Sequence, residues 1–165
     1  MELLFTLDEK NYSNDMPIFE RYGVRAIIKQ NHKFAMQQGN SGEYKMPGGG
    51  VEHGESFHQA LIREVREETG LLVKPETIQE IGEVLEIRAD IKNKGYKYIA
   101  HTLYYECEVS SETVQTSLTK SEVEKGYQLA WAEAENIMSE NKKHTKEYWM
   151  IRDMEFLKWY HSQHN

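Results

Sequence analysis

Hydrophobic and polar residues alternate along several short stretches of the chain. Alternation with a period of two is typical of β-strands that are buried on one face. Tyr22, Val24, Ala26 and Ile28, for example, fall on the same side of an extended segment. This pattern, together with short apolar runs between turn residues, predicts strands at 3–7, 18–30, 33–37, 71–73, 78–91, 96–109 and 126–131.

Turn residues indicate how some of these strands are joined. Asn31 and His32 predict a hairpin between the strands on either side of them. The segment 93–95, Asn-Lys-Gly, predicts a second and longer hairpin, in which Gly82 is a candidate β-bulge. The remaining polar segments, 38–45 and 110–125, are predicted to be loops.

Two other stretches repeat their apolar residues every three or four positions, which predicts helices. The first runs from an N-cap at Ser56 to a stop at Gly70, and the second covers 145–161. A helical turn is predicted at 132–137. The combination of strands and helices predicts a mixed α/β domain with helices packed on a sheet. The apolar side of the last helix, expected to pack in the core, consists of Trp149, Ile151, Met154, Phe156, Leu157 and Tyr160.

Length, charge and cysteine content narrow the class of protein. The 165 residues fit a single domain over 1–165, and a net charge of −7 disfavours a general nucleic-acid-binding surface. The apolar runs are shorter than a bilayer requires, and the N-terminus lacks the pattern of a signal peptide. Cys107 is the single cysteine, which excludes an intramolecular disulfide and predicts a cytoplasmic protein. We expect Cys107 to be a buried structural thiol.

The helix after Ser56 carries an unusual cluster of charge opposite its apolar side. Glu64, Glu67 and Glu68 are spaced three and four residues apart, so their carboxylates converge on one face. Such like-charge pairs destabilise a helix by roughly 0.2–0.5 kcal/mol each. A divalent cation would compensate, and Mg²⁺ prefers oxygen ligands of this kind. The three glutamates are therefore candidate metal ligands.

The stretch around this helix resembles the Nudix box, written G-x5-E-x7-R-E-U-x-E-E-x-G-U with U a bulky aliphatic residue. The match spans residues 49–71 without a departure, and Pro47, Gly48 and Glu52 also fit the common form of the loop. Seven fixed residues, each with a frequency of roughly one in fifteen, coincide by chance on the order of once in 10⁸ starting points. The matching residues are Gly49, Glu55, Arg63, Glu64, Val65, Glu67, Glu68, Gly70 and Leu71.

The resemblance implies an α-β-α sandwich around a mixed sheet, with a catalytic loop-helix-loop that binds Mg²⁺, or Mn²⁺ as a substitute. Glu64, Glu67 and Glu68 would be ligands, together with the backbone carbonyl of Gly48. Glu64 would be the general base, with Glu67 as the rival. The residues that would hold the box together, with a salt bridge from arginine to glutamate, are Gly49, Glu55, Arg63 and Gly70.

The resemblance also implies hydrolysis of a nucleoside diphosphate linked to another group. Some members add an acidic residue from a later loop, for which Glu122 and Glu124 are the candidates. Three basic residues are candidates for contacting substrate phosphate, whereas His101 is expected to be structural. These basic residues are Arg25, Lys45 and Arg88.

The substrate is left open at this point. Residues 84–90 contain neither the Pro of ADP-ribose hydrolases nor the Tyr of dinucleoside polyphosphate hydrolases. What remains resembles the MutT-like group, which favours a (d)NTP or a similar small nucleotide. The alternatives are ADP-ribose, a nucleotide sugar or a dinucleoside polyphosphate. A non-catalytic nucleotide-binding module and an isoprenoid diphosphate isomerase are two further alternatives. The sequence does not decide between a monomer and a homodimer.

Overall fold

The computed structural model describes residues 1–144 and 147–164. Its elements, in chain order, are β1 (Leu3–Asp8), β2 (Ile18–Ile27), β3 (Lys29–Gln30), β4 (Lys33–Gln38), β5 (Tyr44–Lys45), β6 (Gly48–Gly50), α1 (Phe57–Thr69), β7 (Leu71–Val73), a 3₁₀ turn (Pro75–Thr77), β8 (Gln79–Ala89), β9 (Lys97–Glu106), β10 (Val109–Thr113), α2 (Lys120–Glu124), β11 (Gln128–Ala132), α3 (Ala134–Asn141) and α4 (Tyr148–Gln163).

The larger sheet is mixed and has the strand order β1-β8-β9-β2-β6. β1 runs parallel to β8 and β2 runs parallel to β9, whereas the β8–β9 and β2–β6 pairs are antiparallel. A smaller sheet combines β11, β4 and β3, with β5 paired to β4, and β10 pairs with β7. The predicted α/β class with a mixed sheet is confirmed.

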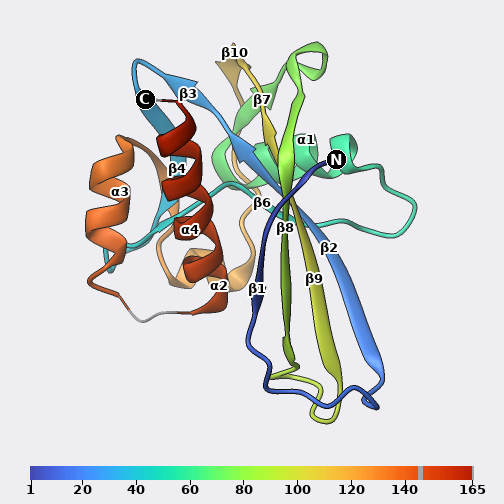
Figure 1. Cartoon of the computed structure of the whole chain (residues 1–165). Helices are drawn as coiled ribbons and strands as arrows, with labels where there is room; N and C mark the ends of the chain where they lie inside the picture. The colour runs from blue at the N-terminus through green and yellow to red at the C-terminus, as the bar shows by residue number, and fades with distance from the viewer. Residues whose placement is uncertain (145–146, 165) are drawn as a thin grey trace.

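Helices cover the strands from both sides, which gives the expected α-β-α layers. Figure 1 shows α1 behind the strands and α3 and α4 in front of them. Alternate residues of β2 enter the two cores: Val24 and Ala26 pack on the α1 side, and Ile27 packs on the side of α3 and α4. The lower parts of β1, β8, β9 and β2 extend beyond the helices (Figure 1).

The predicted long hairpin is confirmed as β8 and β9, and the register shifts beside Gly82 as expected for a bulge. Its second strand ends at Glu106, and Val109 begins β10 instead. The hairpin at Asn31 and His32 is correct only at its tip, where both turn residues have positive φ. The main part of the preceding strand, β2, pairs with β9, a contact so distant in sequence that local patterns carry no signal for it.

Three other predictions need correction. The predicted loop at 110–125 contains the end of β10 and helix α2, which begins with a capping box between Thr119 and Glu122. The predicted loop at 38–45 ends in β5, and the helical turn at 132–137 is part of the longer α3. The last helix is confirmed as α4, although the predicted start at 145–146 lies outside the described residues.

The buried face of α4 also differs from the predicted stripe. Phe156, Leu157 and Tyr160 are buried as expected, whereas Trp149, Ile151 and Met154 are partly buried. Met150 and two charged residues, Arg152 and Asp153, complete the buried face. The two charged residues pair with charged residues of the sheet, and this partnership is invisible in the helical period of the sequence.

Candidate active site

The loop that leads into α1 lies directly on the sheet. Gly48, Gly49 and Gly50 form β6, which pairs with residues 23–25 of β2. A Cβ on Gly48 would stand 2.0 Å from the carbonyl oxygen of Val24, and Gly48 also has φ 147°. Only glycine can therefore hold the loop this close to the strand.

Helix α1 begins and ends where the sequence predicts. The Ser56 hydroxyl accepts a hydrogen bond from the Gln59 N–H, and the Gln59 side chain accepts one from the Ser56 N–H. Gly70 ends the helix in the left-handed region, with φ 76°. The apolar side of the helix packs against the sheet and leaves the opposite side to the acidic residues.

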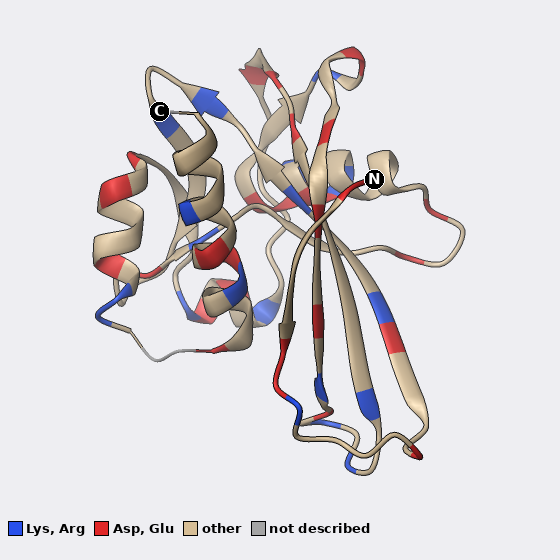
Figure 2. Cartoon of the chain, viewed as in Figure 1, with Lys and Arg blue, Asp and Glu red and all other residues tan. Residues whose placement is uncertain are grey.

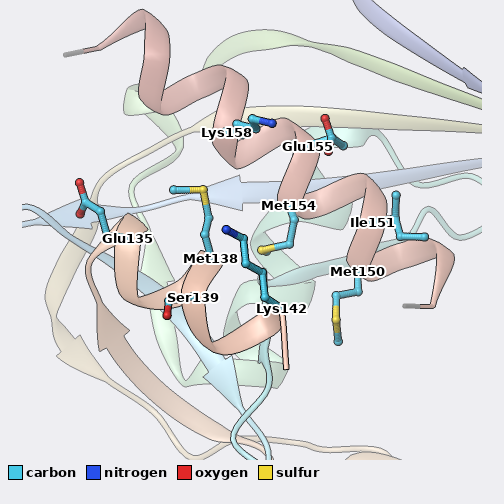
Figure 3. Close-up of a pocket in the computed structure, with 9 residues that line it drawn as sticks. All are labelled: Glu135, Met138, Ser139, Lys142, Met150, Ile151, Met154, Glu155 and Lys158. Atoms are coloured by element: carbon cyan, nitrogen blue, oxygen red, sulfur yellow. The ribbon is translucent and has the colours of Figure 1, made fainter. Parts of the chain in front are cut away.

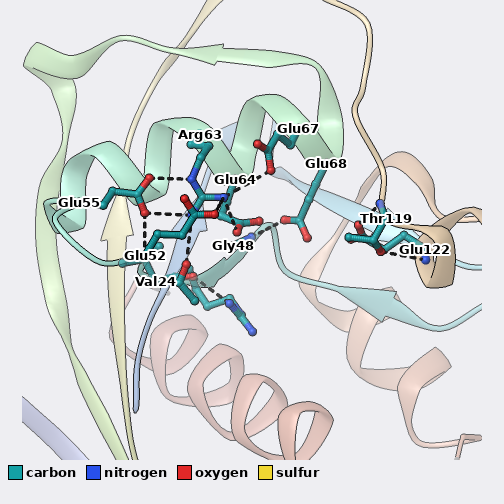
Figure 4. Close-up of polar contacts among 12 residues, drawn as sticks. Val24, Gly48, Glu52, Glu55, Arg63, Glu64, Glu67, Glu68, Thr119 and Glu122 are labelled. Carbon is teal, nitrogen blue, oxygen red and sulfur yellow. Dashed lines mark hydrogen bonds and ion pairs between the residues drawn. The ribbon is translucent and has the colours of Figure 1, made fainter. Parts of the chain in front are cut away.

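Arg63 connects the loop to the helix. Its Nε and Nη2 donate to both oxygens of Glu55, at 2.6 and 2.9 Å, so the expected salt bridge is present. Nη2 also donates to the carbonyl oxygen of Gly50, and Nη1 donates to Glu64 at 2.8 Å and to Glu67 at 3.4 Å (Figure 4). The hydrogen bonds from Arg63 lower the pKa of Glu55 below its usual range.

Glu68 is the most buried of the three helix glutamates. Its Oε1 accepts a hydrogen bond from the Gly48 N–H at 2.7 Å. Burial raises the pKa of Glu68 to about 8, and a hydrogen bond with Glu122 adds to the rise, whereas Lys45 and the Gly48 N–H oppose it. The pKa of Glu122 is lowered, because hydrogen bonds from Thr119 and Glu68 outweigh the effect of burial.

These side chains line a cleft of about 410 Å³ between α1, β6 and α2. Arg21 and Lys45 bring positive charge to the same cleft. Five carboxylates and four basic side chains line it in all, namely Glu52, Glu64, Glu67, Glu68, Glu122, Arg21, Lys45, Arg63 and Lys125. Arg63 pairs with three of these carboxylates, those of Glu52, Glu64 and Glu67.

The donor set suits a hard divalent cation. All of its acidic side chains offer oxygen, the ligand type that Mg²⁺ prefers. A Cβ at Gly49 would stand 2.6 Å from the Glu64 carboxyl group, so the missing side chain leaves that carboxylate its space. In the part of the chain that is described, no three acidic, His or Cys side chains stand together as metal ligands. Arg63 holds two of the carboxylates instead.

The other candidates from the sequence fall in different places. Lys45 lines the cleft beside Glu68, and Glu122 enters it from α2, whereas Glu124 is exposed and does not line it. Arg25 and Arg88 lie outside this cleft, in an adjoining groove on the sheet. Cys107 is buried, as predicted, and burial raises the pKa of its thiol to about 12.

Arg21 and Trp149 are cleft residues that the sequence analysis missed. Both line the cleft and the adjoining groove. Arg21 lies four residues before Arg25 on the same face of β2, so strand alternation offered a signal for it. Trp149 was assigned to the core because it belongs to the apolar stripe of the last helix.

A third hollow, of about 570 Å³, lies between α3 and α4 (Figure 3). Its lining combines Met138, Met150, Ile151 and Met154 with charged and polar side chains, namely Glu135, Ser139, Lys142, Glu155 and Lys158. It shares no lining residue with the carboxylate cleft. We assign no role to it.

Comparison with known proteins agrees with the fold. A structure described as a NUDIX hydrolase from Nitrosomonas europaea aligns with a TM-score of 0.63 and 23% identity, covering 88% of this chain and 90% of the other. A MutT protein from Methanosarcina mazei Go1 aligns with a TM-score of 0.55 and 20% identity, covering 90% and 99%. At these identities the likeness shows the fold alone.

Sequence comparison adds one named relative and a family. The relative is an ADP-ribose pyrophosphatase of Methanocaldococcus jannaschii, 36% identical over 59 residues, which are 33% of this chain and 35% of the relative. The match therefore spans about a third of that protein. The family described as NUDIX domain matches residues 20–153, which are most of the chain. This chain belongs to the NUDIX domain family.

Proposed function

We propose that the chain is a divalent-metal-dependent hydrolase that cleaves a pyrophosphate bond in a nucleoside diphosphate linked to another group, with a (d)NTP or a similar small nucleotide as substrate. The observation that carries this proposal is one cleft that gathers Glu64, Glu67 and Glu68 from α1 and Glu122 from α2. Arg21 and Lys45 lie at the same cleft, where they can contact phosphate.

The reaction is a hydrolysis in which water supplies the nucleophile. The water oxygen bonds to phosphorus, the bond from phosphorus to the bridging oxygen breaks, and the water's proton passes to a carboxylate. A bound Mg²⁺ or Mn²⁺ neutralises phosphate oxygens and lowers the pKa of water. The ligands would be Glu64, Glu67, Glu68 and the Gly48 carbonyl, with Glu122 as an additional acidic residue.

We assign the proton transfer to Glu64, with Glu67 as the rival. In the structure both carboxylates are held by Arg63, at 2.8 and 3.4 Å, so both are positioned by the same cation. Glu68 is less suited to accept a proton from water, because it is buried against the Gly48 N–H. We propose a structural role for Arg63, Glu55, Gly49 and Gly70.

The test is a panel of substrates assayed for phosphate or pyrophosphate release. It contains dNTPs, oxidised dNTPs, ADP-ribose, nucleotide sugars and dinucleoside polyphosphates, each with Mg²⁺, with Mn²⁺ and with EDTA. ADP-ribose is included because the Methanocaldococcus jannaschii relative is described as an ADP-ribose pyrophosphatase. Metal-dependent turnover of one class is expected, and folded protein that releases nothing from any of them would contradict the proposal.

The first variant to assay is Glu67→Gln, which keeps the shape of the side chain but removes its charge. We expect it to lose most of the hydrolysis, about 100-fold or more, while the protein stays folded. Glu76→Gln is the matched control, since Glu76 is exposed in the 3₁₀ turn and does not line the cleft. Near-normal turnover by Glu67→Gln would remove this residue from the site.

Two further points belong to the proposal. The cytoplasm is the proposed compartment, supported by the single and buried cysteine. None of the helices in the described residues has the length and apolar composition needed to cross a membrane. We propose that residues 1–165 form one domain.

A further inference from the structure

A groove of about 810 Å³ opens directly beside the carboxylate cleft. It shares Arg21, Gly49 and Trp149 with the cleft, so the two hollows are continuous at these residues. Its floor is the face of β2, β8 and β9 that points toward α4, and its wall is the first turn of α4. Basic and acidic segments lie close together there (Figure 2). The volume lies within the range of roughly 300–1,000 Å³ found for small-molecule sites.

The carboxylates of this groove already have partners. Glu86 pairs with Arg88 at 3.1 Å and with Arg152 at 3.3 Å. Asp153 accepts from the Tyr104 hydroxyl at 2.7 Å and from Arg152 Nε at 2.9 Å. Asp153 is fully buried and does not itself line the groove, and its Oδ2 has no hydrogen bond to any described residue but lies 3.6 Å from Arg25 Nε. The carboxylates at the floor of the groove are therefore all paired with arginines.

Two further carboxylates at the rim are also engaged. Asp90 accepts hydrogen bonds from the backbone N–H groups of Lys92 and Asn93, at 2.9 and 3.1 Å. Glu147 accepts one from the indole N–H of Trp149, at 2.6 Å. The groove thus has little acceptor capacity left for a ligand.

Some hydrogen-bond donors of the groove, by contrast, have no partner. Arg88 Nε and Arg152 Nη2 are buried without a hydrogen-bond partner. Arg152 is 7% exposed, and the pocket that it lines is the groove. The side chain of Arg21, at the junction with the cleft, makes no hydrogen bond or ion pair with any residue in the described ranges. A buried N–H without a partner is unfavourable because it has lost its hydrogen bond to water, so a ligand that offers acceptors would remove this cost.

The formal charges point the same way. The groove is lined by the cations Arg21, Arg25, Arg88, Lys92 and Arg152 and by the carboxylates Glu86, Asp90 and Glu147. With the buried Asp153, which pairs with Arg25 and Arg152, five positive charges stand against four negative ones. Arg25 lies 3.6 Å from Asp153 and is 8% exposed. The excess of one positive charge favours an electron-rich ligand over one that presents donors.

Flat side chains complete the groove. The Arg88 guanidinium lies between the rings of Tyr98 and Tyr148, with its central carbon 4.5 and 4.0 Å from the ring centroids. Trp149 lines the junction with the cleft, and no aromatic ring of the described residues stacks on it. Because the two tyrosine rings cover the Arg88 guanidinium, the surface left for a planar base to stack on is the indole of Trp149.

We infer that this groove binds the nucleoside end of the substrate and prefers a base whose edge carries a carbonyl oxygen, such as hypoxanthine, guanine or uracil, over adenine. A carbonyl accepts hydrogen bonds from guanidinium N–H groups, whereas the exocyclic amino group of adenine is a donor and would face donors. The diphosphate would then reach the carboxylate cleft past Arg21. The inference rests on the proposed function for the identity of the ligand as a nucleotide.

The test compares ligands that differ at one position of the base. Inosine 5′-monophosphate and adenosine 5′-monophosphate differ by a 6-oxo against a 6-amino group, and ribose 5-phosphate lacks the base. Binding of each to the unmodified protein is measured by calorimetry without metal. We expect inosine monophosphate to bind about tenfold or more tightly than adenosine monophosphate, with ribose 5-phosphate weaker than both.

Equal affinity for the two nucleotides would overturn the preference for a carbonyl, and ribose 5-phosphate binding as tightly as inosine monophosphate would overturn nucleoside recognition. Because none of these ligands contains a pyrophosphate bond, the result does not depend on hydrolysis. If the protein binds inosine monophosphate more tightly than adenosine monophosphate but hydrolyses no substrate in the panel, the nucleoside-binding groove is supported and the proposed hydrolase activity is contradicted.

Two variants locate the recognition. Arg88→Met keeps a long side chain between the two tyrosine rings but removes the donors, and it should bring inosine monophosphate down to the affinity of adenosine monophosphate. Trp149→Ala should weaken both nucleotides toward ribose 5-phosphate. Lys158→Met, on the exposed side of α4, is the control and should bind like the parent. Unchanged selectivity in a folded Arg88→Met protein would overturn the role of Arg88.

Discussion

At the scale of single residues, adjacent glycines of the loop are required for different reasons. Gly48 is required by the backbone, because a side chain there would collide with the carbonyl group of Val24. Gly49 has room on the backbone side but faces the carboxyl group of Glu64 at a distance that no Cβ tolerates. One position therefore sets the path of the chain, and the other sets the place of a candidate catalytic group.

This difference predicts the effect of Gly49→Ala. The added methyl group must displace the Glu64 carboxylate, since the ideal Cβ lies 2.6–2.8 Å from its atoms. A displaced catalytic group costs roughly 100-fold in turnover, while a flexible side chain can move without unfolding the protein. We expect a large loss of kcat with a small change in thermal midpoint, measured by the hydrolysis assay and by calorimetry.

Gly54→Ala serves as the comparison for Gly49→Ala. Gly54 has φ 78° and nothing within 4 Å of an added Cβ, so its alanine variant suffers backbone strain of roughly 1–2 kcal/mol but meets no neighbour. It should lose stability and keep its kcat. If Gly49→Ala were as active as the parent, Glu64 would not need its present position.

At the scale of elements, the helix of the box was predictable because its information is local. Ser56, Gly70 and the three glutamates are related by spacings of a few residues, and the structure places the helix where these spacings put it. Helix α2 had an equally local signal, the capping pair of Thr119 and Glu122, which the polar composition of the segment concealed.

The rest of the site depends on contacts between distant segments. Arg21 reaches the cleft because β2 pairs with both β6 and β9. The β2–β9 pair is parallel, so no tight turn joins the two strands and the local sequence does not predict their pairing. Trp149 reaches it because α4 begins beside the sheet. The sequence predicts a helix with an apolar side, but its local pattern does not distinguish residues that pack in the core from a residue, such as Trp149, that lines a cleft.

One prediction at this scale concerns His101, which connects three strands. Its ring lies between Glu20 of β2, at 2.8 Å, and Glu83 of β8, and it stacks on Tyr22. Burial lowers the pKa of His101, but the hydrogen bonds with Glu20 and Glu83 outweigh this and raise it. These contacts join His101 to β2 and β8, and the same residue also lines the groove beside the cleft.

Because the folded pKa of His101 is raised, its stabilising effect is complete below the unfolded value of about 6.5 and is lost as the pH rises through the folded pKa. His101→Gln should lower the free energy of unfolding at pH 6 and have less effect at pH 9, as measured by urea denaturation. His53→Gln, in the exposed loop, is the control and should show no such pH dependence. An equal loss at both pH values would rule out the charged histidine as the cause.

At the scale of the whole molecule, α4 is attached to the sheet by both apolar and ionic contacts. Phe156 stacks on Tyr104 with a centroid distance of 3.6 Å, and the hydroxyl of Tyr104 donates to Asp153. Asp153 is fully buried and forms ion pairs with Arg152 of its own helix and with Arg25 of β2. One carboxylate therefore joins a core of the protein to the floor of the groove.

The last prediction follows from this position. Asp153→Asn preserves the shape of the side chain but leaves two buried arginines with less negative charge, and breaking a buried pair in this way costs roughly 3–5 kcal/mol. Burial raises the pKa of Asp153, but Arg152 and Arg25 outweigh this and lower it. The contribution of Asp153 to stability is thus present above the unfolded pKa of about 3.9 and lost as the pH falls through the folded pKa.

Urea denaturation of Asp153→Asn at pH 7 should show the full loss of stability, and the parent and the variant should converge only in strong acid. Glu155→Gln, exposed on the same helix, should change the free energy of unfolding by no more than about 0.5 kcal/mol. A similarly small effect of Asp153→Asn would mean that the apolar contacts of α4 suffice to hold it on the sheet and that the buried charges serve the groove instead.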